Sequence, residues 1–330
     1  MTGWPPLRRN SAFILAAPLL AAFAALFVGA YGISPSGVLG ALFSGRVSTE
    51  ASVVLDIRLP RVLLAGIVGA ALAGSGATLQ AVFRNPLIDP FLLGISAGAA
   101  LGCALGIGFL PWVPLPLLAF AFGLGAVTLA WTLGKGVGGD ARLSLVLSGV
   151  VVSALFTALV SLVKVLVDPS RLQSIVFWLM GSFSLADWRQ VEVAAAGAAI
   201  GLAPVILLRW RLNLLSLGDE DASNLGVNVP RLRLILVAAT TLAAATAVSV
   251  CGIVGWVGLM VPHLVRMACG PDHRRLLPLA MAGGAAFLIV ADTLARTLAS
   301  WEVPVGIVTA LAGAPFFVLL MRRGQRGWSP

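Results

Sequence analysis

Residues 143–167 read LSLVLSGVVVSALFTALVSLVKVLV, and this stretch decides the fold class. It contains a single charged side chain, Lys164. A helix needs roughly 20 predominantly apolar residues to cross the hydrocarbon core of a bilayer. The stretch is therefore predicted to form one transmembrane helix.

Nine more windows of similar character surround this stretch. Only 11% of the residues are charged, whereas a soluble domain carries about a quarter. The first window is long, lacks a small-x-small cleavage site and is followed by nine others, so we interpret it as a span and not as a secretory signal. We predict an all-α integral membrane protein with ten transmembrane helices. The windows are 13–31, 62–82, 91–109, 116–133, 143–167, 191–210, 232–251, 254–269, 276–294 and 305–321.

Basic residues are distributed unevenly over the predicted loops. With ten spans and a cytoplasmic N-terminus, fifteen of the 22 Lys and Arg side chains fall inside and seven fall outside. Cytoplasmic loops of membrane proteins carry such an excess of positive charge. We therefore predict that both termini are cytoplasmic, and the formal charge of +9 requires no nucleic-acid partner.

The chain is predicted to be one domain, residues 1–330, because no polar interruption is long enough for a soluble domain. Ten spans divide into two halves of five, and an odd number per half permits an inverted repeat. A short helix at the outer mouth is expected within residues 168–188. Glycines recur every four residues in the third window, which predicts the close approach of another helix. They are Gly94, Gly98, Gly102 and Gly106.

Sequence motifs for enzyme chemistry are missing. The nearest match to a phosphate-binding loop, at residues 134–136, lacks the spacing and the hydroxyl residue of such a loop. His263 and His273 have no partner at the spacing of a zinc protease. The three cysteines lie in or at the end of windows without C-x-x-C spacing, which favours packing over a disulfide or a metal site. We predict no catalytic residue and no metal site.

A proton-coupled secondary transporter is the less favoured alternative. Such carriers usually place carboxylates in mid-span, whereas Glu192 and Asp292 lie near window ends. A receptor-like membrane module without transport is a third possibility. Dependence on a separate ATPase would exclude the secondary transporter, and accumulation of cargo would exclude the receptor.

Six segments, in this order along the chain, carry a resemblance to a known family. They are RLPR (58–61), GATLQAVFRNPLIDPFLLGISAGA (76–99), FWLMGS (177–182), GDEDASNLGVNV (218–229), GWVGLMVPHLVR (255–266) and ADTLAR (291–296). Together they resemble the permease subunits of ATP-binding cassette (ABC) importers for iron chelates, heme and cobalamin, which are the FecCD-like permeases. Ile253 and Trp256 stand where proline and phenylalanine are common in that family. Because of these two differences, the resemblance does not predict whether the eighth window bends locally.

The resemblance implies a pore formed by two copies of the chain in the lipid of the bacterial inner membrane. Two cytoplasmic ATPase subunits would bind the ATP, and a periplasmic substrate-binding protein would deliver the cargo. No permanently bound cofactor is implied. The expected cargo is heme, with a ferric siderophore or cobalamin as the alternative by the same mechanism of alternating access.

The resemblance also implies an ATPase-coupling segment at about residues 212–231, between the sixth and seventh windows. Carboxylates in the first turn of a short helix favour its positive N-terminus, and a glycine in a left-handed conformation ends such a helix. The coupling residues are Gly218, Asp219, Glu220, Asp221, Ala222, Ser223, Leu225 and Gly226.

Two further sites are implied. Arg58, Arg61 and Arg296 match positions where the family presents arginines to carboxylates of the binding protein, because a guanidinium can bind a carboxylate through two hydrogen bonds. Asp292 lies one turn before Arg296 and is expected to orient it. For the substrate path the candidates are Arg171 and Lys164, which would attract an anionic cargo.

Overall fold

The computed structural model describes residues 8–29, 31–43, 48–135, 141–299 and 301–324, and every regular element in these ranges is a helix. Each of the ten windows corresponds to one principal helix, which confirms the all-α prediction. Among the described residues, six helices are long and apolar enough to cross a membrane, and four more apolar helices are shorter. The count of ten spans stays a prediction. The principal helices are α1 (Arg8–Phe27), α4 (Leu59–Val82), α5 (Ile95–Phe109), α6 (Leu115–Lys135), α7 (Ala141–Leu166), α9 (Trp188–Leu207), α12 (Val229–Cys251), α13 (Val257–Cys269), α14 (His273–Ala295) and α15 (Val305–Gly324).

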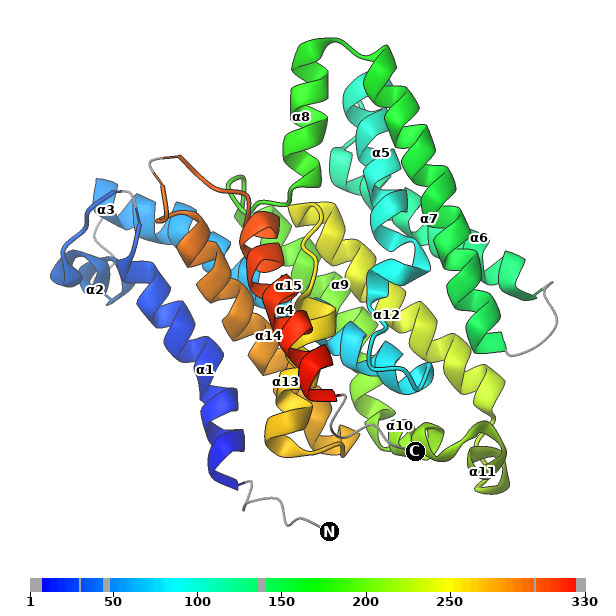
Figure 1. Cartoon of the computed structure of the whole chain (residues 1–330). Helices are drawn as coiled ribbons and strands as arrows, with labels where there is room; N and C mark the ends of the chain where they lie inside the picture. Colours follow the sequence, from blue (N-terminus) through cyan, green and yellow to red (C-terminus); the bar gives the residue numbers. More distant parts are fainter. Residues whose placement is uncertain (1–7, 30, 44–47, 136–140, 300, 325–330) are drawn as a thin grey trace.

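Shorter elements connect these helices and gather at the two ends of the bundle (Figure 1). At one end lie α2, α3 and α8, and at the other end lie α10 and α11; α1 begins and α15 finishes toward this second end. The described chain therefore begins and ends on the same side of the bundle, as expected if both termini lie on one side of the membrane. The short elements are α2 (Pro35–Phe43), α3 (Thr49–Ser52), the π-helical turn η1 (Val53–Arg58), the 3-10 turn η2 (Pro90–Leu93), α8 (Pro169–Leu179), α10 (Arg209–Leu217) and α11 (Asp219–Asn224).

Helix α8 fills the first half of the segment predicted for the outer helix. Asp168 caps it, because its carboxylate accepts hydrogen bonds from the backbone N–H groups of Ser170 and Arg171 at 3.1 and 3.0 Å. A hydrogen bond from the Ser170 hydroxyl and the one from the Arg171 backbone hold the pKa of Asp168 below its ordinary value. After Leu179 the chain turns at Gly181, whose φ is +71°, so the helix does not reach residue 188.

Small residues build the centre of the bundle. Helices α4 and α12 are the most buried of the six long apolar helices, and they pack on each other. Helix α4 also packs along α14, where a Cβ added to Gly69 would lie 2.2 Å from the carbonyl oxygen of Gly284. Backbones must approach this closely in a membrane, because van der Waals packing replaces the hydrophobic effect there. Helix α4 is the second window of the first predicted half, and α12 is the second window of the second half. Their equivalent places agree with an inverted repeat, which stays a prediction.

The glycines of the third window hold α5 against α6. A Cβ on Gly98 would lie 2.3 Å from the carbonyl oxygen of Phe122, and one on Gly102 would lie 2.3 Å from that of Leu118. The predicted close approach of a second helix is confirmed. Gly94 does not belong to this contact, because it precedes α5 with a φ of +93°, a conformation that glycine adopts without strain.

We expect Gly102→Ala to lower the free energy of unfolding by about 1–3 kcal/mol, because its methyl group would overpack a contact with backbone atoms. Gly125→Ala is the matched control: nothing lies within 4 Å of its added Cβ on α6, so the free energy should change by less than about 1 kcal/mol. Thermal unfolding of both purified variants in one detergent measures the difference. Equal midpoints would contradict the packing of α5 on α6.

The bend that the sequence left open lies before the eighth principal helix. Gly252 and Trp256 have φ angles of +76° and +73°, and α13 begins only at Val257. A positive φ is rare for a bulky residue. The ring of Trp256 packs edge-on against Phe317 of α15, with 6.3 Å between ring centroids, so the bend brings α13 and α15 together.

Candidate transport and coupling sites

The predicted coupling residues form a helical knob, residues 218–226, at one end of the bundle (Figure 1). Gly218 separates α10 from α11 with φ +140° and ψ +161°, a conformation that only glycine adopts readily. Asp219, Glu220 and Asp221 then occupy the first turn of α11, as predicted. Their negative charge is favourable at a helix N-terminus.

The other end of the knob closes on itself. The N–H of Gly226 donates to the carbonyl of Ser223 at 2.9 Å, and that of Val227 donates to the carbonyl of Ala222 at 3.0 Å. Gly226 has a φ of +82°, so this is the left-handed helix ending that the sequence predicts. Ala222 is fully buried and anchors the knob, whereas Leu225 is 59% exposed at its tip.

Asp219 ties the knob to three other parts of the chain. Its carboxylate lies 2.9 Å from a guanidinium nitrogen of Arg233 in α12, 3.2 Å from one of Arg84 after α4, and 3.9 Å from one of Arg142 at the start of α7. A network of charges around one carboxylate constrains its position more than a single exposed pair does. The carboxylate therefore connects the knob to α12, to the start of α7 and to the turn after α4.

The predicted docking arginines converge around one pocket of about 560 Å³, the outer arginine cluster. Arg58 and Arg61 are only 3% and 7% exposed. Arg58 donates to the carbonyls of Leu26, at 2.6 Å, and of Tyr31. The structure thus brings the three side chains together, but most of their N–H groups donate hydrogen bonds to other groups of the same chain.

Asp292 pairs with Arg61, and not with Arg296 as predicted. Arg61 Nε and Nη2 both lie 2.9 Å from an oxygen of Asp292, and Arg61 Nη1 donates to Glu302 at 2.7 Å. Arg296 instead donates to the carbonyl of Ala25 at 2.6 Å. The i,i+4 spacing that motivated the prediction is overridden by α4, which packs on α14 and brings Arg61 to Asp292.

A second cavity, of about 640 Å³, lies among η2, α5, α7 and α13; we call it the central cavity. Lys164, a candidate for the substrate path, lies in its wall; that role stays a prediction. Arg171 is used differently: its guanidinium donates to the carbonyl of Gly108 at 2.6 Å and pairs with Asp168 at 3.1 Å. Arg171 therefore fastens the start of α8 to the end of α5.

Sequence reasoning missed the hydroxyl groups of the central cavity. Ser153, Thr157 and Ser161 of α7 follow each other at four-residue spacing and line one wall. That spacing in an otherwise apolar window was the available signal, since residues four apart share a helix face. Asp89 lines the same cavity and caps η2, and burial raises the pKa of its carboxyl to about 6.

Comparisons with known proteins identify similar chains over nearly the whole length. The model of the FecCD transport family matches residues 17–323. The chain is 46% identical over 282 residues to the "Probable iron chelatin transport system permease protein" of Helicobacter pylori, covering 86% of each chain. It is 45% identical over 320 residues to the "Hemin transport system permease protein HmuU" of Yersinia pestis, covering 91% of this chain and 94% of that one.

Among solved structures, one described as an inward-facing metal-chelate type ABC transporter superimposes with a TM-score of 0.87. It is 36% identical in sequence, and the superposition covers 96% of this chain and 99% of that one.

Proposed function

The chain belongs to the FecCD transport family, and we propose that it is the permease of an importer that moves heme across the bacterial inner membrane. Permeases of this family are not enzymes, because a separate subunit supplies the ATPase. In the proposed assembly both termini are cytoplasmic, as is the knob, and ten helices span the bilayer. Two ATPase subunits would receive the two knobs of a dimer.

A second copy of the chain is proposed to complete the pore. Helices α7 and α15 lie on either side of the loop that leads into η2 (Figure 1). Residues of η2 and of α7 line the central cavity. Both α7 and α15 expose large apolar side chains, among them Val151 at 61% and Leu311 at 72%. Pairing of this face about a two-fold axis would enclose two central cavities in one path, and lipid would cover the remaining apolar surface.

Lys164 in the wall of the central cavity is the observation that carries the choice of heme. Heme is planar and largely apolar and bears two propionates, and a dimer would offer it two Lys164 ammonium groups. The cavity wall is mostly apolar, with hydroxyl groups that form only weak contacts, which favours release. The 45% identity to a hemin permease supports this cargo. A ferric siderophore or cobalamin is the alternative.

The binding protein is proposed to dock on the outer arginine cluster. Three arginines face two carboxylates there, Asp292 and Glu302, which leaves one positive charge in excess. Glu302 is the more exposed of the two carboxylates, and its side chain is 48% exposed. A carboxylate of the binding protein could replace Glu302 beside Arg61 without disturbing the buried pair with Asp292.

ATP-dependent uptake tests the function. Proteoliposomes that hold the permease, its ATPase and its binding protein are offered hemin, a ferric siderophore and cobalamin in parallel. We expect ATP-dependent accumulation of hemin, and we expect Lys164→Ala to reduce it roughly tenfold, the effect of losing about 1.4 kcal/mol of attraction for the propionates. Lys164→Arg keeps the charge and is the matched control.

Three results would contradict parts of this proposal. Siderophore or cobalamin uptake without hemin uptake would keep the mechanism and discard the cargo. Equal hemin uptake by Lys164→Ala and by the unaltered chain would remove Lys164 from the path. Uptake that needs no ATP would favour the secondary transporter.

A further inference from the structure

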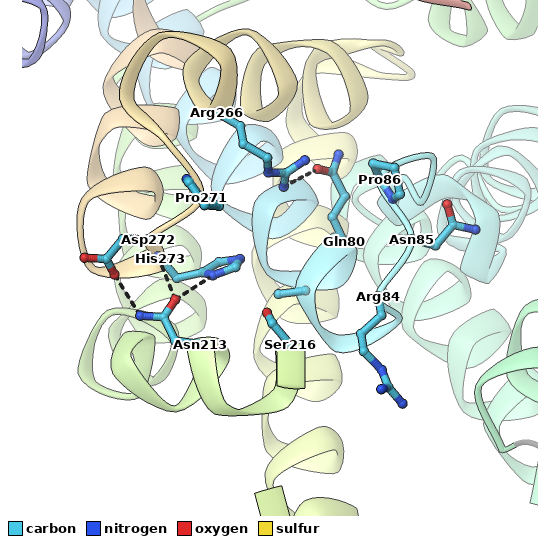
Figure 2. Close-up of a pocket in the computed structure, with 11 residues that line it drawn as sticks. Gln80, Arg84, Asn85, Pro86, Asn213, Ser216, Arg266, Pro271, Asp272 and His273 are labelled. Carbon is cyan, nitrogen blue, oxygen red and sulfur yellow. Dashed lines mark hydrogen bonds between the residues drawn. The ribbon is translucent and has the colours of Figure 1, made fainter. Parts of the chain in front are cut away.

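A polar pocket of about 480 Å³ lies beside the knob, between the end of α4, α10 and the junction of α13 with α14. Figure 2 shows Arg84, Arg266, Gln80, Ser216 and His273 around it. Neither the central cavity nor the outer arginine cluster shares any of these residues. The proposed transport path therefore leaves this pocket without a role.

Hydrogen bonds around Asn213 determine where the imidazole of His273 carries its hydrogen (Figure 2). Asn213 Nδ2 donates to Asp272 at 2.7 Å, and since a carboxylate only accepts, the orientation of the amide is fixed. Asn213 Oδ1 must then face His273, where it lies 2.9 Å from Nδ1 and accepts. Nδ1 therefore bears the hydrogen, and Nε2 of the neutral ring bears a lone pair.

The Nε2 atom of His273 has no partner. It is buried and makes no hydrogen bond to any described residue, and His273 as a whole is only 6% exposed. In Figure 2 the ring reaches into the space between Arg266 and Ser216. A buried acceptor without a donor costs about 1–3 kcal/mol. A ligand that brings its own hydrogen would remove this cost.

Cationic donors lie on the other side of the pocket. Arg266 donates from one amino group to Gln80 at 2.9 Å, and its other N–H groups make no hydrogen bond to the described residues. Arg84 donates one amino group to Asp219. Its φ of +51° belongs to the left-handed ending of α4, where the N–H of Asn85 donates to the carbonyl of Gln80 and that of Arg84 donates to the carbonyl of Ala81.

We propose that this pocket binds hydrogen phosphate. The anionic oxygens accept from Arg84 and Arg266, and the P–OH hydrogen is donated to His273 Nε2. Four charged or titratable groups line the pocket, Arg84, Arg266, Asp272 and His273; with a neutral imidazole their sum is one positive charge. Sulfate and the phosphodiester of a lipid bring no hydrogen at neutral pH, so the pocket selects against both.

This site goes beyond transport, and it also touches the knob. Arg84 contributes to the pocket and to the ion pairs of Asp219, so a bound phosphate competes with Asp219 for the same guanidinium. An anion in the pocket is therefore expected to loosen the knob from the end of α4.

Equilibrium dialysis of radiolabelled phosphate against the purified full chain in nanodiscs at pH 7.5 tests the site. We expect saturable binding, with sulfate competing roughly tenfold less well, since one hydrogen bond to a charged group is worth about 1.5–3 kcal/mol. Arg266→Gln should weaken binding of phosphate roughly tenfold or more for the same reason. Arg275→Gln, an exposed arginine outside the pocket, should leave it unchanged.

Further variants distinguish the role of each group. His273→Phe should remove the preference for phosphate over sulfate while sulfate still binds. Arg84→Gln, on the surface, tests the cationic side of the pocket if Arg266→Gln does not fold. Glycerol 3-phosphate should compete no better than sulfate, because the second pKa of a phosphate monoester is about 6 and its phosphate has almost no P–OH hydrogen at pH 7.5.

The proposal fails if the unaltered chain binds no phosphate at millimolar concentration or binds sulfate equally well. It fails equally if Arg275→Gln weakens binding as much as the variants within the pocket do.

Discussion

Arg61→Ala is expected to lower the free energy of unfolding by about 3–5 kcal/mol, a large part of the stability of a typical protein. The side chain of Asp292 is 2% exposed, and Arg61 is the only described residue paired with it. Nε and Nη2 of Arg61 hold both carboxylate oxygens. Without the guanidinium, a carboxylate would remain inside the bundle with no opposite charge in contact.

The matched control removes both charges. Arg61→Met combined with Asp292→Leu replaces the buried pair by apolar side chains, which is often neutral or stabilising. Thermal unfolding in detergent should show a large loss of stability for Arg61→Ala and recovery in the double variant. If Arg61→Ala unfolds like the unaltered chain, the pair does not hold α4 to α14.

The double variant also tests the docking proposal separately from folding. If it folds and still binds the periplasmic protein with unchanged affinity, Arg61 has only a structural role and docking involves other residues of the outer arginine cluster. If it folds and docking is lost, the cluster serves both purposes. Charge reversal at Arg61 alone could not distinguish these cases, because it would also disrupt the buried pair.

The helices could be predicted from the sequence because a segment inside a membrane must satisfy its own backbone hydrogen bonds. An apolar window of the right length has few other structures available to it. The knob could be predicted for a similar reason: the acidic turn that begins at Asp219 and the ending at Gly226 are local features, determined by residues close in the chain.

Side-chain partners distant in sequence could not be predicted. The family resemblance placed Arg58 and Arg61 on a docking surface, yet both side chains are buried and bond within the chain. Asp292 was assigned to its helical neighbour, whereas packing of α4 on α14 supplies Arg61. The three arginines at Asp219 come from separate helices, and no local pattern identifies them.

Gly226→Trp is expected to abolish ATP-dependent uptake while the chain still folds. No atom of the described residues lies within 4 Å of a Cβ added to Gly226, so the indole meets no obstacle from them. The positive φ costs roughly 1–2 kcal/mol for any residue other than glycine. A loss of uptake much larger than this strain explains would therefore arise at the contact between the knob and the ATPase subunit that is proposed to receive it.

Gly226→Asn is the matched control, because asparagine tolerates the left-handed conformation and is short. It bears nearly the same backbone strain and should retain uptake, since its short side chain does not obstruct this contact. Measurement of ATP hydrolysis alongside uptake in the same proteoliposomes separates two cases: hydrolysis without uptake means a bound but uncoupled ATPase, and loss of both means that the ATPase no longer binds. Normal uptake by Gly226→Trp would remove the knob from the ATPase contact, and the three ion pairs of Asp219 would then be structural only.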